Sequence, residues 1–502
     1  MKNTMDKKTA YIMVQGTMSN AGKSLVAAGL CRVFRQDGFK VCPFKSQNMA
    51  LNSYVTEDGL EMGRAQVMQA EAAGVKPSVY MNPILLKPTG NMTSQVIVNG
   101  KVHADMSAKD YFAYKKKLLP DIQNALDALG EEYDIIVIEG AGSPAEINLK
   151  ENDIVNMGIA KLTGSPVILV GDIDRGGVFA QLYGTVALLD EDEKKLIKGL
   201  VINKFRGDKT ILDPGIDQIE SLMNIPVCGC LPYMDIRLDD EDSLAERLNN
   251  KQKKDIDIVV IRLGHISNFT DFNVFDEYDN VSVRYVKDPE EIEGADLLII
   301  PGSKNTIADM RALKDSGMDE AIRSFAENGK PVIGICGGFQ MLGEKIEDEA
   351  GAEGGGEAEG IGLLPILTEL TAHKKRVLCR GQFGQIGGVL GILSGRDYSG
   401  YEIHMGNSRA VSGGVTEFTA SGTGFCTGSV YGTYVHGIFD EDGVSDGIVS
   451  ALCKAKGLEF RKKNKDHRSF KESQYDKLAD MIRKYMDMDA IYEMMGLENG
   501  NI

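Results

Sequence analysis

Short runs of consecutive apolar residues alternate along this chain with longer segments in which apolar residues recur every three or four positions. An unbroken apolar run is expected of a strand in a parallel sheet that is covered on both faces. The longer periodic segments are expected to form helices. The pattern therefore predicts an α/β fold with mostly parallel sheets. The strands expected from these runs, with the polar residues that some of them include, are residues 11–15, 39–44, 133–139, 166–170, 200–206, 225–229, 257–261, 281–286, 296–300 and 331–335.

A charged stretch divides these runs into two sets. Residues 239–254 carry acidic and then basic side chains between the sixth run and the seventh. The chain of 502 residues also exceeds the ~300 residues at which single cores stop growing. Glycine, alanine and glutamate dominate residues 350–360, which predicts a mobile surface loop. We expect an N-terminal domain at residues 1–240, a linker at 241–255, a second α/β domain at 256–450 and a helical tail at 451–502.

The first apolar run leads directly into a glycine loop, a Gly-Lys-Ser sequence and a helical pattern. Strand, glycine loop and helix in this order are typical of a phosphate-binding P-loop. Five residues separate the two glycines here, instead of the usual four. The backbone amides of such a loop face the phosphates together with the helix N-terminus. The predicted ATP-binding residues are Gly16, Thr17, Asn20, Gly22, Lys23 and Ser24.

Acidic and polar residues stand at the carboxyl ends of the later strands of the first set. Glu139 ends a buried run, and an acid at this position of a P-loop protein is expected to hold Mg²⁺ together with Ser24. Asp172 and Asp174 are candidates for metal or substrate contacts. Asn203 is either an adenine contact or an ordinary turn asparagine.

Ligands of open α/β sheets bind beyond the carboxyl ends of the strands. The polar residues after the second strand therefore predict a ligand site, with a plain polar loop as the alternative. A lysine in the apolar stretch between Pro83 and Pro88 is costly unless it meets an anion. The candidate substrate or phosphate contacts are Lys45, Gln47, Asn48, Arg64, Lys87 and Asp174.

A cysteine ends the last run, in the sequence Gly334-Ile335-Cys336-Gly337-Gly338. A strand, a sharp turn rich in glycine and a helix form a nucleophile elbow, and the helix N-terminus favours the thiolate. His436 follows a short apolar segment further on and is the candidate base. The alternative is a buried structural cysteine beside an unrelated histidine. The candidate oxyanion-binding amides are those of Gly302, Ser303 and Gly337.

Composition narrows the class of protein. The net charge of −17 argues against nucleic acid as the main partner. The chain has no run of ~20 apolar residues that would span a membrane, and its start has no signal-peptide pattern. Eight cysteines scattered over a long chain indicate free thiols in a reducing cytoplasm.

A P-loop half and a Cys-His half together indicate one chemistry. The thiolate attacks the side-chain amide of glutamine and releases ammonia. The other half uses ATP to activate a carboxylate, because a carboxylate is a poor electrophile, and the ammonia then forms an amide. Glutamine, ATP and Mg²⁺ are therefore the expected ligands.

Nearly the whole chain resembles the cobyric acid synthase family, the glutamine-dependent corrinoid amidotransferases of cobalamin biosynthesis. The P-loop spacing is similar to that of dethiobiotin synthetase, and the second half resembles class I glutamine amidotransferases. The motifs that carry the resemblance begin at Gln15, Phe44, Asn82, Ser94, Glu139, Gly171, Ile202, Pro301 and Tyr434.

The resemblance implies a specific reaction. The substrate is expected to be adenosylcobyrinic acid a,c-diamide, which is amidated at its b, d, e and g carboxylates. Such a polycarboxylate would give Lys45, Arg64 and Lys87 an electrostatic role. The alternatives are a cobyrinic acid a,c-diamide synthase, another glutamine-dependent carboxylate amidotransferase such as one acting on a cell-wall lipid, and a P-loop partitioning ATPase with an inactive glutaminase-like domain.

One position departs from the class I pattern. Many class I amidotransferases place a glutamate two residues after the histidine, where this chain has Ile438. The resemblance implies that the corrinoid branch also lacks this glutamate. The acid that orients His436 is then either absent or supplied from elsewhere in the chain, and Glu402 is one candidate. His404 is expected to be a structural histidine.

Overall fold

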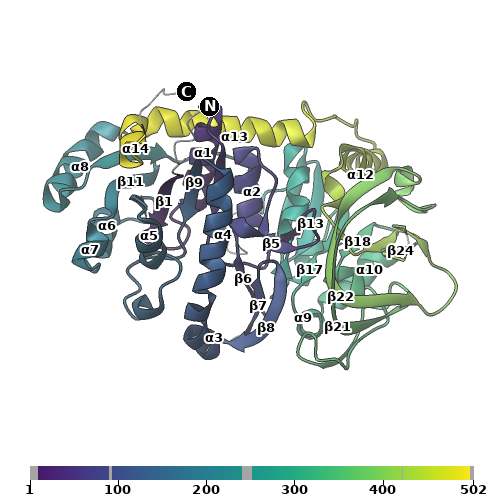
Figure 1. The fold of residues 1–502 in the computed structure, drawn as a ribbon. Helices are drawn as coiled ribbons and strands as arrows, with labels where there is room; N and C mark the ends of the chain where they lie inside the picture. Colours follow the sequence, from purple (N-terminus) through teal and green to yellow (C-terminus); the bar gives the residue numbers. More distant parts are fainter. Residues whose placement is uncertain (1–8, 90–92, 240–250, 421, 498–502) are drawn as a thin grey trace, which may run out of the picture.

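The computed structural model describes residues 9–89, 93–239, 251–420 and 422–497, and it contains two α/β halves joined by a broad interface (Figure 1). Most of the predicted linker at 241–255 lies outside the described residues. Among the described residues, no helix has both the length and the apolar character needed to cross a membrane. The α/β class predicted from the apolar runs is confirmed in both halves.

The first half is built on a sheet of six strands that are all parallel. Alternate residues of its central strand point to opposite faces: Met13 belongs to one buried cluster, while Ile12 and Val14 belong to another. Both faces are therefore covered, as the unbroken apolar runs require. In spatial order the strands are β12 (Val227–Pro232), β11 (Ile197–Phe205), β10 (Val167–Asp172), β1 (Ala10–Gly16), β9 (Ile135–Glu139) and β2 (Val41–Phe44).

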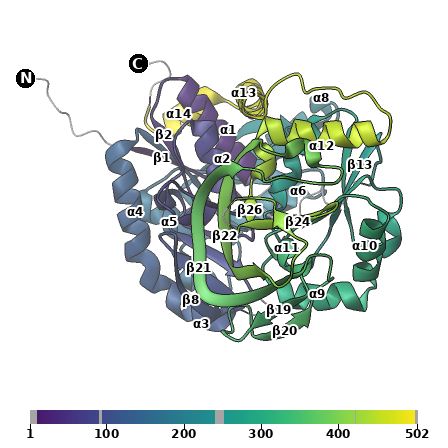
Figure 2. The same ribbon diagram turned by 90° about the vertical axis from the view of Figure 1, so that its right-hand side faces the viewer.

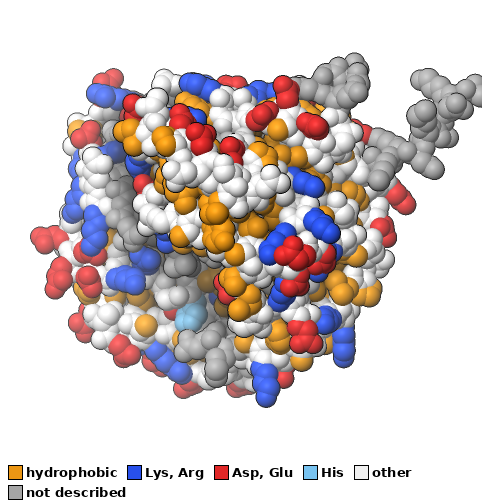
Figure 3. Space-filling view, turned by 90° about the vertical axis from the view of Figure 1, so that its left-hand side faces the viewer, with side chains coloured by type: hydrophobic (Ala, Val, Ile, Leu, Met, Phe, Trp, Pro, Cys, Tyr) orange, Lys and Arg blue, Asp and Glu red, His pale blue; other side chains and the backbone are white. Residues whose placement is uncertain are grey.

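Two groups of helices cover this sheet. One face packs against α1 (Lys23–Gln36), α13 (His467–Tyr485) and α14 (Met488–Met494). The other face packs against α4 (Leu119–Glu132), α5 (Met157–Thr163), α6 (Val178–Ala187) and α8 (Lys209–Met223). Figure 3 shows the outer side of this half, where hydrophobic side chains gather among charged ones. The remaining helices of this half are α2 (Arg64–Ala73), α3 (Ala108–Tyr114) and α7 (Glu191–Lys194).

Small sheets lie between the large sheet and the second half (Figure 1). One has the order β3 (Gln47–Met49), β6 (Ile84–Pro88), β7 (Thr93–Val98) and β8 (Lys101–Ser107). The other pairs β4 (Ser53–Val55) with β5 (Glu61–Gly63). Only three residues separate β3 from β4. This short connection links the ligand-facing end of the first sheet to the interface between the halves.

The second half has a seven-stranded sheet whose first five strands are parallel. Helices α9 (Thr306–Asp315), α10 (Met318–Glu327), α11 (Gly337–Met341) and α12 (Asp442–Ala455) accompany it. The strands are β15 (Val281–Val286), β13 (Ile256–Ile261), β16 (Leu297–Ile300), β18 (Val332–Ile335), β25 (Val430–Thr433), β24 (Gly424–Thr427) and β23 (Thr416–Glu417).

A second sheet of this half contains two long antiparallel strands that curve along the interface (Figure 2). It has the order β20 (Gly356–Glu359), β19 (Lys345–Asp348), β21 (Ile366–Gln382), β22 (Asp397–Ala410) and β26 (Val435–His436). A two-stranded ladder joins β14 (Ile266–Ser267) to β17 (Gly302–Ser303). The strand β20 and its turn replace the loop predicted at 350–360. The Asp348 carboxylate accepts hydrogen bonds from the backbone N–H groups of Ala352, Glu353 and Gly355 and thereby holds the turn.

The C-terminal helix α13 connects the two halves. Asp476 on this helix forms an ion pair of 2.7 Å with Arg32 of α1. At the start of the helix, His467 Nδ1 lies 2.5 Å from the carboxylate of Glu277 in the second half. Figure 1 shows the helix running along one edge of both halves. The helical pattern at the C-terminus therefore belongs to a docked helix that spans the interface.

Candidate active sites

The predicted P-loop connects β1 to α1 at the carboxyl edge of the first sheet. Gly22 has a φ of 105°, a conformation that residues with a Cβ rarely adopt. A Cβ there would also lie 2.0 Å from the side-chain nitrogen of Asn203. That amide donates a 2.8 Å hydrogen bond to the carbonyl of Ala21. Asn203 is buried and supports the loop, and its role as an adenine contact stays a prediction.

The residues predicted to hold Mg²⁺ are neighbours in space. The hydroxyl of Ser24 donates a 2.9 Å hydrogen bond to Glu139 Oε1. The same carboxylate accepts hydrogen bonds from Lys45 Nζ at 2.9 Å and from Gln69 Nε2 at 2.6 Å. Among the described residues there is no group of three or more His, Cys, Asp or Glu side chains placed to hold a metal. A hydroxyl and one carboxylate leave other positions for phosphate oxygens and water, which suits Mg²⁺.

A cavity of about 510 Å³ opens beside this loop. Lys23 reaches its wall, where its ammonium group donates to the carbonyls of Met18 and Gly142. The predicted contacts Lys45, Gln47 and Asn48 line the same cavity. The ligand site predicted beyond the second strand therefore adjoins the P-loop.

Three other predicted substrate contacts lie elsewhere. Arg64 forms a 2.7 Å ion pair with Asp239, and Asp174 is partly exposed and pairs with Arg206. Lys87 lies at the interface between the halves, where its ammonium group bonds Glu61 at 2.9 Å and Ser53 at 2.8 Å. The anion that offsets the burial of Lys87 is thus a glutamate of the chain itself. The charged groups of Arg64, Asp174 and Lys87 pair within the chain, and their roles as substrate or phosphate contacts stay predictions.

The sharp turn predicted at Cys336 is present between β18 and α11. Cys336 has a φ of 50° and a ψ of −106°, a strained conformation for a residue with a side chain. A Cβ on Gly334 would lie 2.6 Å from the carbonyl oxygen of Gly338. A Cβ on Gly338 would lie 2.0 Å from the carbonyl oxygen of Ile300. The glycines therefore allow the close backbone approach that forms the elbow.

His436 lies in hydrogen-bonding contact with Cys336 and is itself held by an aspartate. Its Nδ1 lies 2.7 Å from Asp271 Oδ2, and Asp271 Oδ1 accepts the N–H of Gly437 at 3.0 Å. Burial lowers the pKa of His436, but the charges of Asp271 and Cys336 outweigh this effect and raise the pKa to about 10. The site therefore favours the imidazolium form of His436.

The orienting acid is thus Asp271, which the sequence prediction did not consider. Glu402 instead bonds His404 Nε2 at 3.0 Å and Lys375 at 2.7 Å. Its candidacy as the partner of His436 is wrong. Both ring nitrogens of His404 are occupied, because Nδ1 donates to the carbonyl of Gly406 at 2.7 Å. This arrangement fits the structural role expected for His404.

The residues of the predicted oxyanion amides lie beside the same two side chains. A Cβ on Gly337 would lie 2.7 Å from the backbone nitrogen of Ser303, so these two residues are in contact. A Cβ on Gly302 would lie 3.2 Å from His436 Cε1. Backbone amides gathered beside a nucleophile can stabilise the oxyanion of a tetrahedral intermediate.

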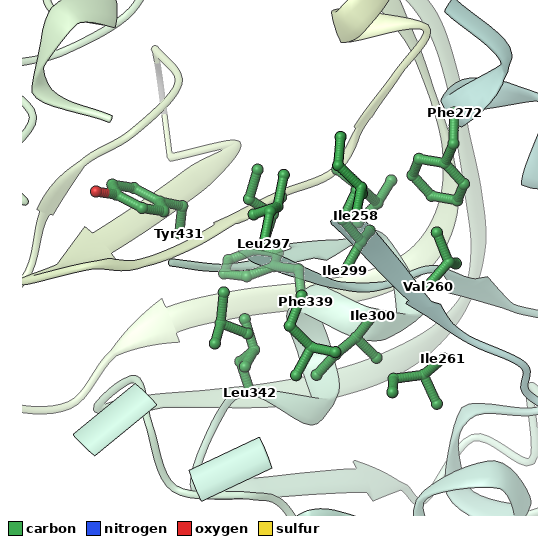
Figure 4. Packing of buried hydrophobic residues seen from close by; sticks show 14 of the residues in the cluster. Ile258, Val260, Ile261, Phe272, Leu297, Ile299, Ile300, Phe339, Leu342 and Tyr431 are labelled. Atoms are coloured by element: carbon green, nitrogen blue, oxygen red, sulfur yellow. The ribbon is translucent and has the colours of Figure 1, made fainter. Parts of the chain in front are cut away.

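The core of the second half fixes this arrangement. Figure 4 shows Phe272, next to Asp271, packed in the same hydrophobic cluster as Phe339, three residues after Cys336. Both phenylalanines are fully buried. The elements that carry the acid and the nucleophile therefore share one core, which keeps their relative positions rigid.

The first half also contacts the base. Ser53 donates its backbone N–H to Asn268 Oδ1 at 3.1 Å, and its carbonyl accepts from the hydroxyl of Tyr401 at 3.0 Å. Asn268 begins the 3₁₀ segment Phe269–Glu277, which carries Asp271. The ring of Tyr401 is stacked on the imidazole of His436, with centroids 5.5 Å apart. Ser53 of the first half thus bonds the residue that begins the segment carrying Asp271 and the tyrosine that stacks on His436.

Comparison with known proteins decides the family. Residues 12–244 match the CobQ/CobB/MinD/ParA nucleotide binding domain, and residues 257–444 match the CobB/CobQ-like glutamine amidotransferase domain. A protein of Lachnoclostridium phytofermentans described as cobyric acid synthase is 54% identical over 96% of this chain and 98% of its own length. The chain belongs to the cobyric acid synthase family. The two matched domains include the P-loop and the Cys336–His436 pair of this chain, respectively.

Other members are similar over the same extent. The cobyric acid synthase of Caldanaerobacter subterraneus is 48% identical over 96% of this chain and 98% of its own length. That of Citrobacter koseri is 48% identical over 97% of this chain and 98% of its own length. This member of the cobyric acid synthase family is accordingly a glutamine amidotransferase that forms C–N bonds, with a nucleotide-binding half.

Proposed function

We propose that this enzyme amidates the b, d, e and g carboxylates of adenosylcobyrinic acid a,c-diamide, with glutamine as nitrogen source and ATP hydrolysis as driving force. The single observation that carries the proposal is the pairing of a Cys336–His436–Asp271 site with a P-loop site in one chain of this family. The proposed domains are residues 1–240 and 256–450, with the tail at 451–502. The eight cysteines are all free thiols, which fits a reducing cytoplasm.

Glutamine is hydrolysed at the Cys336 site. The thiolate attacks the side-chain amide carbon, and the amides around Gly302, Ser303 and Gly337 bind the oxygen that becomes negative. The imidazolium of His436 gives its proton to the leaving nitrogen, which departs as ammonia. Water, deprotonated by His436, then attacks the glutamyl thioester and releases glutamate.

The P-loop half activates the acceptor. A corrinoid carboxylate takes the terminal phosphoryl group of ATP, which yields an acyl phosphate and ADP. Ammonia then displaces phosphate and leaves the amide. Ser24 and Glu139 would hold Mg²⁺, and the ion would supply positive charge to the phosphate oxygens. Lys23 supplies a positive charge at the same place, and its backbone neighbours in the loop orient the phosphates.

The cavity beside the P-loop suits a macrocycle that carries carboxylates. Its wall includes the lysines Lys115 and Lys150 together with the apolar side chains of Met49 and Leu149. Met49 is 58% exposed and Leu149 is 43% exposed, so both offer apolar surface to a ligand. Burial lowers the pKa of Lys115, and a nearby carboxylate would favour its charged form.

Mass spectrometry of the corrinoid tests this proposal. The purified protein is incubated with adenosylcobyrinic acid a,c-diamide, glutamine, ATP and Mg²⁺. We expect stepwise conversion of four carboxylic acids to amides. Cobyrinic acid without amides serves as the control acceptor, because an a,c-diamide synthase would amidate it preferentially. An unchanged a,c-diamide, with glutamine hydrolysis intact, would show that the acceptor is a different carboxylate.

A further inference from the structure

Three lysines surround the pocket that contains Cys336, and they differ in their partners. Lys87 and Lys374 both bond the buried carboxylate of Glu61, at 2.9 and 2.5 Å. Lys304 lines the same pocket and is only 8% exposed. Its ammonium group makes no hydrogen bond or ion pair with any part of the chain that the structure describes. A buried ammonium without a partner is costly, so its presence indicates an anionic ligand.

A carboxylate lines the same pocket as this ammonium group. Glu353 lines the pocket together with Lys304, Cys336 and His436. Glu353 Oε2 accepts the N–H of Thr306 at 2.6 Å, which fixes its position. The charges of Lys304 and Glu353 influence each other without forming an ion pair. One positive and one negative group, separated beside a nucleophile, match the two charges of an α-amino acid.

We infer that Lys304 binds the α-carboxylate of glutamine and that Glu353 binds its α-ammonium group, which makes the two residues the specificity determinants of the glutaminase pocket. This inference rests on the proposed use of Cys336 as the glutaminase nucleophile. The side-chain amide of the bound glutamine then points toward Cys336. The position of Lys304 suits this role, because it directly follows Ser303, one of the amides proposed to bind the oxyanion.

Burial supports the assignment of both residues. Burial and the nearby charge of Lys87 lower the pKa of Lys304, while burial raises the pKa of Glu353. An α-carboxylate beside Lys304 and an α-ammonium group beside Glu353 would each favour the charged form. Binding of zwitterionic glutamine would therefore offset the free-energy cost of burying the charged groups of Lys304 and Glu353.

The test compares glutamine with two analogues in the full-length protein. 4-Aminobutanamide lacks the α-carboxylate of glutamine, and glutaramate lacks the α-amino group. Wild-type kcat/KM for release of ammonia is expected to fall about 10- to 100-fold for each analogue, the range for loss of one charged hydrogen-bonded contact. Lys304→Met is expected to lose a similar factor with glutamine and to discriminate little against 4-aminobutanamide. Glu353→Gln is expected to lose discrimination against glutaramate only.

Lys314→Met is the matched control, because Lys314 is exposed on α9 and lies outside the pocket. Ammonia-dependent amidation by each variant shows that its fold is intact. A Lys304→Met protein that still discriminates against 4-aminobutanamide as the wild type does would overturn the inference. So would a variant that retains the wild-type kcat/KM for glutamine. Failure of the corrinoid assay in the wild type would contradict only the acceptor assignment, since ammonia release is measured without a corrinoid.

Discussion

At the scale of single residues, the decisive contact is the carboxylate of Asp271 on His436. The two oxygens of Asp271 hold the imidazole Nδ1 and the N–H of Gly437. This fixes the ring, directs Nε2 toward the substrate side and stabilises the imidazolium. The acid that holds His436 thus comes from 165 residues earlier in the chain, and not from position 438.

Asp271→Asn is expected to lower kcat for glutamine hydrolysis by about 10²- to 10⁴-fold, because an amide cannot stabilise the imidazolium. The wild-type pH profile should fall on the alkaline side as pH rises through about 10, where His436 loses its proton. In the variant this alkaline limb should move to lower pH, since the charge that raises the pKa is gone. Glutaminase assays across pH measure both effects.

Glu402→Gln is the matched control for this prediction. Glu402 bonds His404 and Lys375 and does not contact His436. We expect kcat for glutamine hydrolysis to change only a few-fold, because the variant loses charged contacts that do not involve the reacting atoms. A large loss in Glu402→Gln together with a small loss in Asp271→Asn would reverse the assignment.

Some residues of the candidate sites can be predicted from the sequence, and others cannot. The elbow around Cys336 and the P-loop are local, so their glycine spacing alone predicts the geometry. Asp271 has no local signature, because its partner is brought to it only by the fold. The one available signal is an acid between Phe269 and Phe272, since a buried acid in an apolar stretch needs a partner. Lys87 gives the same signal, a charged residue in an apolar stretch, but the anion that pairs with it is Glu61 of this chain.

At the scale of elements, the strand β4 connects the two chemistries. Its first residue, Ser53, bonds Asn268 and Tyr401, and the ring of Tyr401 packs on His436. The strand lies three residues beyond β3, which lines the cavity beside the P-loop. If acceptor binding displaces β3, the displacement would therefore be transmitted through Ser53 to the imidazole of His436. Glutamine hydrolysis should accordingly depend on the state of the first half.

Tyr401→Phe tests this dependence, because it removes the hydroxyl that bonds Ser53 and keeps the ring on His436. The stimulation of glutamine hydrolysis by ATP and acceptor is expected to fall about 3- to 10-fold, the range for one or two lost hydrogen bonds. Ammonia-dependent amidation should stay unchanged. Tyr398→Phe in the same strand is the control, since its hydroxyl accepts the N–H of Ala420, which also belongs to the second half. Undiminished stimulation in Tyr401→Phe would contradict a role for this contact.

The secondary-structure elements predicted from the sequence are correct where a single apolar run forms a single strand. The runs at 133–139 and 166–170 became β9 and β10 with bounds that differ by one or two residues. The segment at 350–360 was misread, because its composition is low in complexity while its shape depends on Asp348 outside the segment. Contacts with neighbouring elements, which cannot be inferred from composition, fold this segment into a strand and a turn. The turn carries Glu353.

At the scale of the whole molecule, buried contacts join the two halves around the glutaminase pocket. Lys374 of β21 bonds Glu61 of β5, and Arg376 donates to the carbonyl of Gly100 at 2.7 Å. The helix α13 adds ion pairs on both sides of the boundary. The periodic sequence predicted two α/β domains, but it contained no signal for the area over which they meet. The pocket that contains Cys336 is lined in part by Lys87, a residue of the first half.

The central claim is that nitrogen released at Cys336 enters the amide made at the P-loop, and isotope transfer measures this most directly. The enzyme is given glutamine labelled with ¹⁵N in its side-chain amide, unlabelled ammonium, ATP, Mg²⁺ and adenosylcobyrinic acid a,c-diamide. The wild type should form corrinoid amides that carry ¹⁵N, Cys336→Ala should form only unlabelled amides, and Lys23→Ala should form none. Unlabelled amides from the wild type, or ¹⁵N in the product of Cys336→Ala, would contradict the account.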